Sequence, residues 1–272
     1  MHLTAPILLG LALAAPAAGQ DPPLRSYDCL RTILPVTVDG RLDEPAWQTA
    51  PWSEDFTDIL GEAGPAPTLR TRFKMLWDDT GLYVGAELEE PHLWATLTER
   101  DAVIYHEDDF ELFLDPDGDG RLYGELEINA LGTVWDLLLV RPYRDGGPPI
   151  SGWDIRGLRS AVHREGTLND PADTDRGWSV ELHLPWAALT ELATPHRPPR
   201  TGEVWRFTFS RVEWPLEVHQ GVYRKRTDPA TGRPLRESNW VWSPMRKVDM
   251  HEPEYWGRVT FREPPGGGKG RP

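Results

Sequence analysis

Apolar and polar residues alternate over several stretches of this chain. Residues 69–77 place Leu, Thr, Phe, Met and Trp at every second position, with three basic residues between them. A period of two is typical of a β-strand that is buried on one face. The sequence Asp-Asp-Thr-Gly at 78–81 predicts a turn, and residues 82–89 begin a second alternating segment. The two segments are therefore predicted to form a β-hairpin.

The same alternation predicts further strands, which are expected at residues 110–114, 122–129, 133–140, 155–163, 178–184, 204–211 and 255–261. One helix is predicted at 185–192, because Pro185 suits the first turn of a helix and Trp186 and Leu189 share one of its faces. Residues 214–242 lack clear periodicity and are predicted to form long loops. Together these elements predict an all-β fold, an antiparallel β-sandwich of the jelly-roll or immunoglobulin-like two-sheet type with one short helix.

Both ends of the chain differ from its alternating part. Residues 7–15 form a short apolar run, and small residues follow at 17–19. This pattern predicts a cleaved signal peptide and hence a secreted or periplasmic protein. We divide the chain into a signal peptide at 1–19, an N-terminal extension at 20–33, one β-sandwich domain at 34–262 and a disordered tail at 263–272.

The composition narrows the choice of partners. The chain has one cysteine, Cys29, so no disulfide can form within it. Its formal net charge of −14 argues against nucleic acid and against an anionic membrane as partners. The charge is compatible with a neutral ligand and with Ca²⁺.

Residues 115–120 read Asp-Pro-Asp-Gly-Asp-Gly, directly after a predicted strand. Asp115, Asp117 and Asp119 are spaced so that their oxygens could converge on Ca²⁺. An EF-hand would need a glutamate at the twelfth loop position, which is Leu126 here. The segment is not an EF-hand, and two interpretations stay open: a Ca²⁺ site, or an Asp/Gly hairpin turn without metal.

Thirteen tryptophans are an unusual number for 272 residues. Those inside predicted strands, such as Trp77, Trp135, Trp178 and Trp205, are expected in the core. Trp240 and Trp242 flank Val241 and would project to the same side of a strand. An exposed aromatic ring suits the apolar face of a sugar, and nearby carboxylates and amides can bind its hydroxyl groups.

Five ordered motifs resemble those of carbohydrate-binding module family 9, within the wider sandwich group that includes the DOMON domains. They are residues 38–47 (VDGRLDEPAW), 77–84 (WDDTGLYV), 108–115 (DDFELFLD), 177–186 (GWSVELHLPW) and 251–257 (HEPEYWG). The similarity extends over about 34–262. It implies the sandwich fold and a binding site for polysaccharide chain ends or oligosaccharides.

The resemblance also implies which residues bind the sugar. Family members clamp a sugar between two tryptophans. The first position falls on Tyr105 and the second near Met250, so Trp240 or Trp242 is expected to supply the opposing wall. The family's polar ligands match Glu111 and Asn129 here, while a basic position between them is occupied by Glu127. For Glu111 and Glu127 the alternative is a solvated sheet face, and for Asn129 a turn residue.

The resemblance favours a secreted module without catalysis of its own. It would bind plant glycans such as xylan or cellulose in support of carbohydrate catabolism, with a separate glycoside hydrolase as partner. One alternative is a glycoside hydrolase, which needs a pair of carboxylates; the candidates are Glu107, Asp108, Glu111, Glu125 and Glu127. A second alternative is a haem-binding DOMON-like protein, with ligands among Met75, Met250, His106 and His251.

Overall fold

The computed structural model describes residues 24–192 and 198–264. The predicted signal peptide and residues 265–272 of the predicted tail lie outside this part of the chain. The strands are β1 (Ser26–Arg31), β2 (Thr57–Asp58), β3 (Thr71–Trp77), β4 (Gly81–Glu89), β5 (Asp109–Asp115), β6 (Tyr123–Asn129), β7 (Val134–Leu139), β8 (Pro149–Ile150), β9 (Arg159–Glu165), β10 (Gly177–Pro185), β11 (Val204–Glu213), β12 (Leu216–His219), β13 (Val222–Lys225), β14 (Ser238–Val241) and β15 (Gly257–Arg262).

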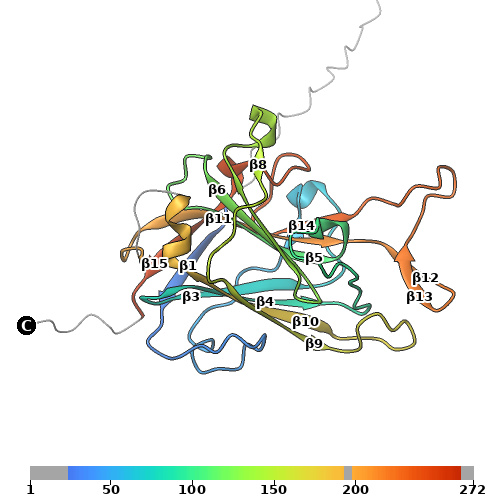
Figure 1. Ribbon diagram of the computed structural model, residues 1–272, viewed down its shortest axis with the longest axis horizontal. Helices are drawn as coiled ribbons and strands as arrows, with labels where there is room; N and C mark the ends of the chain where they lie inside the picture. The colour runs from blue at the N-terminus through green and yellow to red at the C-terminus, as the bar shows by residue number, and fades with distance from the viewer. Residues whose placement is uncertain (1–23, 193–197, 265–272) are drawn as a thin grey trace, which may run out of the picture.

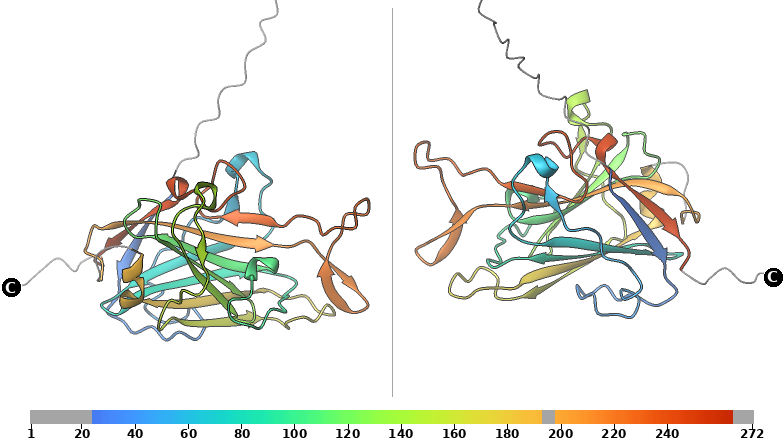
Figure 2. Two further views of the ribbon diagram at one scale, coloured as in Figure 1. Left: turned by 45° about the horizontal axis from the view of Figure 1, so that its top comes forward. Right: turned by 180° about the vertical axis from the view of Figure 1, so that it is seen from behind.

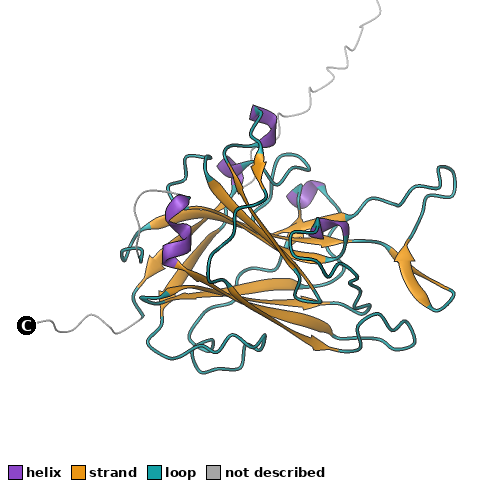
Figure 3. Cartoon of the chain, in the orientation of Figure 1, coloured by secondary structure: helices purple, strands orange, loops and turns teal. Residues whose placement is uncertain are grey.

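Each strand predicted from alternation is present, with ends that differ by a few residues, so the all-β class is confirmed. The predicted helix is the 3₁₀ helix η4 (Trp186–Glu191), which begins directly after Pro185. Helical structure in the described residues is otherwise limited to four shorter 3₁₀ helices (Figure 3). These are η1 (Gly61–Ala63), η2 (Ile104–His106), η3 (Tyr143–Asp145) and η5 (Pro253–Tyr255).

The described strands do not form two separate antiparallel sheets, and this corrects the predicted architecture. Thirteen of them belong to one sheet, whose main path runs β8-β7-β6-β5-β11-β15-β1-β3-β4-β10-β9. The sheet curls, so that β3, β4, β10 and β9 form one layer and β5, β6 and β11 lie across from it (Figure 1). The strand β1 closes the path between the layers and is parallel to both of its neighbours, β15 and β3.

Two parts of the chain gain structure that alternation did not predict. The strand β1 lies in the segment interpreted as an N-terminal extension, and its Tyr27 and Cys29 are buried in the main core. In the segment predicted to form loops, β14 pairs with β11, and β12 and β13 form a separate hairpin. This hairpin projects from the body of the molecule (Figure 2). The pairing of β1 and β14 depends on partners distant in sequence, whereas β12 and β13 pair with one another across residues 220–221.

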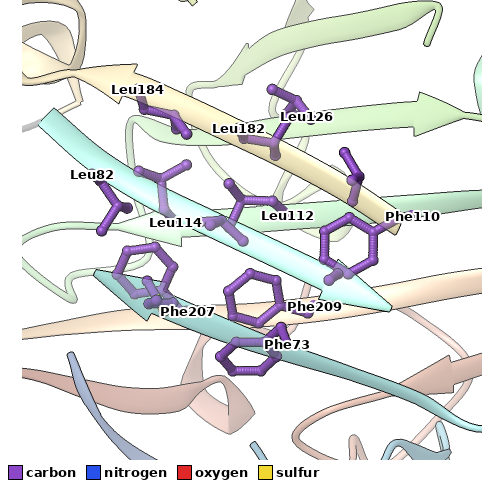
Figure 4. Packing of buried hydrophobic residues seen from close by; sticks show 14 of the residues in the cluster. Phe73, Leu82, Phe110, Leu112, Leu114, Leu126, Leu182, Leu184, Phe207 and Phe209 are labelled. Atoms are coloured by element: carbon purple, nitrogen blue, oxygen red, sulfur yellow. The ribbon is translucent and has the colours of Figure 1, made fainter. Parts of the chain in front are cut away.

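The core fills the space between the two layers. Phe73 of β3 stacks on Phe209 of β11 with 3.9 Å between ring centroids, and Phe209 in turn packs against Phe110 of β5. Leucines of β5, β6 and β10 continue this core (Figure 4). Burying a side chain of this size stabilises the fold by about 1.5–3 kcal/mol.

One buried carboxylate joins two of the family-like motifs. Glu181 on β10 accepts hydrogen bonds from the backbone amides of Asp39 and Gly40 at 2.8 Å each, and from Trp47 Nε1 at 2.6 Å. Gly40 has a φ of +90°, and a Cβ there would lie 2.6 Å from the backbone of His163. The segment 38–47 is thereby held against β10, which explains the Gly and Glu of these motifs in structural terms.

Candidate functional site

The outer face of β5 and β6 carries carboxylates because of strand alternation. Phe110, Leu112 and Leu114 of β5 point into the core, so the residues between them point away from it. Glu111 stands directly opposite Glu127 in the register between β5 and β6. Directly opposed residues of an antiparallel pair share one face, so their side chains are neighbours.

Loops and 3₁₀ helices wall this face into a pocket of about 350 Å³, which we call the acidic pocket. Its lining contains five carboxylates and no Lys or Arg. The lining residues are Ile59, Tyr105, Glu111, Phe113, Glu125, Glu127, Trp135, Tyr143, Val212, Glu237, Asn239, Val248, Asp249, Met250 and His251.

Aromatic rings form part of the pocket's wall. Tyr105 of η2 and Tyr143 of η3 are 42% and 45% exposed, which is high for aromatic residues of this chain. The rings of Tyr105 and Trp135 lie 6.3 Å apart, at 30° to one another. Trp135 Nε1 is buried and has no hydrogen-bond partner among the described residues. These rings offer flat apolar surface beside a polar floor.

The floor is a cluster of buried carboxylates. One oxygen each from Asp109, Glu111 and Glu127 lie within 4.8 Å of one another. Val212 N donates to Asp109 Oδ1 at 3.0 Å, and Tyr105 N donates to Glu127 Oε2 at 2.8 Å. Asp109 Oδ2, Glu111 Oε2 and Glu125 Oε2 are buried without a hydrogen-bond partner among the described residues. Glu111 and Glu125 line the pocket and bring unpartnered acceptors to it, whereas Asp109 is fully buried and is not part of the lining.

Burial raises the pKa of each of these carboxyls, and repulsion from neighbouring carboxylates adds to it for Asp109, Glu125 and Glu127. Burial raises the pKa of Glu111 to about 7. Burial, with the nearby Glu111, raises the pKa of Glu125 to about 8. The pKa values of Asp109 and Glu127 are also well above the ordinary range, through burial first and the neighbouring carboxylates second. A ligand that supplies donors or positive charge would favour the ionised forms.

The sequence-predicted site residues divide into two groups. Tyr105, Glu111, Glu127 and Met250 line the acidic pocket together, although they come from four separate segments. Trp240 and Trp242 are 4% and 1% exposed and pack in the main core, so neither forms an opposing wall. Their side chains share one side of the chain, but that side is the interior.

Asn129 is the last residue of β6 and its side chain holds the turn that follows, which is the structural role that the alternative interpretation predicted. Its Nδ2 donates to the carbonyl of Leu97 at 2.9 Å, and its Oδ1 accepts from the amides of Leu131 and Thr133 at 3.0 Å each. The side chain is fully buried and is not part of the pocket lining. Its amide is used within the protein.

Sequence reasoning did not select several lining residues as sugar ligands. Trp135 was assigned to the core, yet it alternates with the buried Val134 and Asp136 and is only partly buried. The other missed residues come from segments that carry no clear periodic signal; they are Tyr143 in η3, Asn239 in β14, and Glu237 and Asp249 outside regular elements. Glu125 could have been found, because it shares a strand face with Glu127.

The candidates for the two alternative functions are dispersed. Glu107 accepts hydrogen bonds from the amides of Thr96 and Leu97, and Asp108 accepts one from Trp214 N. Among the proposed haem ligands, Met75 is buried in the main core, whereas Met250 and His251 line the acidic pocket.

The Asp115 loop is compatible with both interpretations of its sequence. Asp115, Asp117 and Asp119 each place one oxygen within 4.8 Å of the others. Asp115 also accepts hydrogen bonds from the amides of Gly118 and Gly120, at 2.9 and 2.8 Å, as in an Asx turn. Asp117 and Asp119 are exposed. A carboxylate oxygen has two lone pairs, so the turn and a bound cation can coexist.

Known proteins resemble this chain in sequence and in fold. Exoglucanase XynX of Acetivibrio thermocellus is 24% identical over 155 residues, which are 57% of this chain and 12% of that protein. The chain thus spans a small part of the length of this curated relative.

No helix in the part of the chain that the structure describes is long and apolar enough to span a membrane.

Two solved structures share the fold. One is a Bacteroides uniformis protein provisionally described as carbohydrate-binding, with 14% identity and a TM-score of 0.60 over 88% of this chain and 100% of that one. The other is a carbohydrate-binding module of family 9 from Caldicellulosiruptor kristjanssonii in complex with cellotriose, with 16% identity and a TM-score of 0.55 over 91% of this chain and 99% of that one.

The family resemblance is confirmed for the part of the chain that contains the first three of the five motifs. The described domain has the fold of a solved family 9 module over most of its length. Residues 38–136 match the model of the family described as carbohydrate family 9 binding domain-like.

Proposed function

We propose that the acidic pocket binds a saccharide, either the end of a polysaccharide chain or an oligosaccharide. The observation that carries this proposal is the pocket's construction: exposed Tyr105 and Tyr143 rings stand beside buried carboxylate acceptors. A sugar ring has an apolar face that packs on an aromatic side chain, and hydroxyl groups that donate to carboxylates. The match to family 9 and the cellotriose complex of a structural relative support the same ligand class.

The module would act by binding alone. The glycoside hydrolase alternative requires two carboxylates that flank a glycosidic bond. Glu111, Glu125 and Glu127 instead project from one face of two adjacent strands, so they meet a ligand from the same side. We therefore favour an exported binding protein for plant glycans such as xylan or cellulose, which would act together with a glycoside hydrolase.

Substitution of Tyr105 tests this function. The Tyr105→Ala variant should lose most of its saccharide affinity at an unchanged melting temperature, because the ring is 42% exposed. The wild-type dissociation constant should lie between about 1 μM and 1 mM, since a stacked ring and a few solvated hydrogen bonds must offset the cost of ordering the ligand. Isothermal titration calorimetry on hits from a glycan array measures this affinity.

The matched control is Tyr105→Phe, which keeps the ring and removes the hydroxyl group. It should bind within a few-fold of wild type if stacking is what the ring contributes. Unchanged binding by Tyr105→Ala would place the sugar elsewhere, and no hit on the array would refute the function itself.

We also propose that Asp115, Asp117 and Asp119 bind Ca²⁺ between β5 and β6. Three carboxylates from one loop provide the hard oxygen ligands that Ca²⁺ prefers. The cation would stabilise the hairpin by binding the folded state only, so the melting temperature should rise with added CaCl₂ and fall with EDTA. The double variant Asp117→Asn/Asp119→Asn should show no change of melting temperature with CaCl₂ or EDTA. Equal melting temperatures in EDTA and in CaCl₂ would contradict the Ca²⁺ site and support the interpretation of the loop as a hairpin turn without metal.

A further inference from the structure

The acidic pocket differs from two other acidic clusters of the described residues in having no internal cation. Glu90, Asp108 and Glu213 surround the buried Arg211, whose Nη2 lies 2.6 Å from Glu90 and 2.7 Å from Glu213. Asp101, Asp136 and Asp154 surround Arg100, which is hydrogen-bonded to Asp136 and Asp154. Burial of carboxylates in this protein is thus accompanied by an arginine in both of these places.

The carboxylates of the acidic pocket have no such partner. No ion pair of the described residues involves Asp109, Glu111, Glu125 or Glu127. The one basic side chain in the lining is His251, and burial lowers its pKa to about 4, so it is neutral at physiological pH. The ionised forms of Glu111, Glu125 and Glu127 therefore have no cation of the protein paired with them, and a cation supplied by a ligand would favour their ionisation.

Cations outside the lining are engaged elsewhere. Lys225 places its ammonium group 3.2 Å from the centre of the Trp214 ring. Arg144 forms a two-pronged hydrogen bond with Glu254, at 3.0 and 2.9 Å. Neither residue lines the acidic pocket. A positive charge that enters the pocket would have to come with the ligand.

The aromatic wall indicates what kind of cation fits. A protonated amine carries three N–H donors, and the lining residues Glu111 and Glu125 each have an unpartnered acceptor oxygen. The faces of Tyr105 and Trp135 attract an organic cation and also accept the apolar face of a sugar ring. A bare metal ion would use the carboxylates but would leave the rings without a function.

We propose that the acidic pocket prefers a saccharide with a free, protonated amino group over a neutral saccharide. This inference rests on the proposed function, because it assigns the ligand class of the same site. The ammonium group would sit on the carboxylate floor while the sugar ring packs on the aromatic wall. The resemblance implies a basic residue at the position of Glu127. A carboxyl group in place of that cation favours a ligand that is itself positively charged.

The test compares two short oligosaccharides of equal length that differ in one group. One is a fully deacetylated glucosamine oligomer, and the other is its N-acetylated counterpart, which carries no charge. Calorimetry at pH 6.5 and 0.15 M salt should give at least about tenfold tighter binding for the amine, since charge-assisted hydrogen bonds are roughly twice as strong as neutral ones. The salt concentration limits general attraction to the acidic protein.

Variants separate the pocket from net charge. Glu127→Gln should narrow the preference for the amine, whereas Glu62→Gln, which removes one exposed carboxylate outside the pocket, should leave it unchanged. The Glu127→Gln variant should fold, because a buried neutral amide needs no compensating charge. Tyr105→Ala keeps the charge of the protein and should still weaken amine binding. If neither Tyr105→Ala nor Glu127→Gln changes the affinity for the amine, general attraction to the acidic surface accounts for the binding. That result would overturn the inference.

The remaining outcomes distinguish the inference from the proposed function. Equal or tighter binding of the N-acetylated or a neutral oligosaccharide would refute the amine preference and leave saccharide binding intact. If no saccharide binds, both the amine preference and the proposed function are refuted. Binding of a neutral saccharide that requires Ca²⁺ and is lost in Glu127→Gln would show that a metal ion supplies the charge, and this would also overturn the inference.

Discussion

At the scale of single residues, the same chemistry supports binding in one place and folding in another. Tyr105 and Asn129 were both predicted to contact sugar, and they lie near the same end of the β5–β6 pair. Tyr105 exposes its ring to the acidic pocket, whereas Asn129 uses its amide to hold a turn. The difference lies in whether the polar atoms have partners inside the protein.

Asn129→Ala should therefore affect stability rather than specificity. The substitution leaves the amides of Leu131 and Thr133 and the carbonyl of Leu97 without their buried partner. Each unsatisfied buried group costs about 1–3 kcal/mol, so the free energy of unfolding should fall by about 2–4 kcal/mol. Urea denaturation measures the loss. A variant of normal stability with lost saccharide binding would instead make Asn129 a ligand.

At the scale of elements, buried side chains connect segments that are distant in sequence. Glu181 of β10 binds the backbone of Asp39 and Gly40 and the indole of Trp47. The segment 38–47 contains no regular strand, so this carboxylate supplies the partners that a sheet would otherwise provide. The motif residues that mark the family are, at this place, fold residues.

Glu181→Gln should loosen this segment. The amide keeps an acceptor for Trp47 but turns an NH₂ group toward the donors of Asp39 and Gly40, so about 1–3 kcal/mol of stability should be lost. Hydrogen exchange should show the largest loss of protection at residues 38–47. Glu165→Gln, at an exposed position of the neighbouring strand β9, is the control and should exchange like wild type. Uniform exchange changes in both variants would argue against the local role of Glu181.

At the scale of the whole molecule, acidic groups are buried with raised pKa values. Glu111 and Glu181 reach about 7, and Glu90 and Glu125 about 8, each chiefly through burial. The folded state thus holds these protons more tightly than the unfolded chain, whose glutamates have pKa values near 4.3. The stability associated with them is fully present below about pH 4 and is lost as pH rises through 7–8.

The free energy of unfolding should accordingly decrease from pH 5 to pH 8 at constant salt. Chemical denaturation at each pH measures it. Glu125→Gln cannot ionise, so its curve should be flatter than that of wild type, with the difference largest at pH 8. Asp109, Glu111 and Glu127 lie near Glu125 on the same pair of strands and should titrate with it. Stability that rises between pH 5 and pH 8 would contradict the raised pKa values.

Local sequence determined the strands and part of the site. Alternation specifies which face of a strand is apolar, so β3, β4, β5, β6, β10 and β11 could be predicted, and Glu111 and Glu127 could be placed on an outer face. The family motifs added Tyr105 and the position of Met250, both of which line the pocket. These features depend on residue spacing within a segment, which the sequence shows directly.

Tertiary structure decided the rest. The parallel pairing of β1 depends on partners in β3 and β15, and the burial of Trp240 and Trp242 depends on the sheet that curls over them. Alternation shows that two residues share a side but does not show whether that side meets the core or the solvent. The lack of Lys and Arg in the lining of the acidic pocket is of this kind, because it depends on which distant cations the fold brings close and which it keeps away.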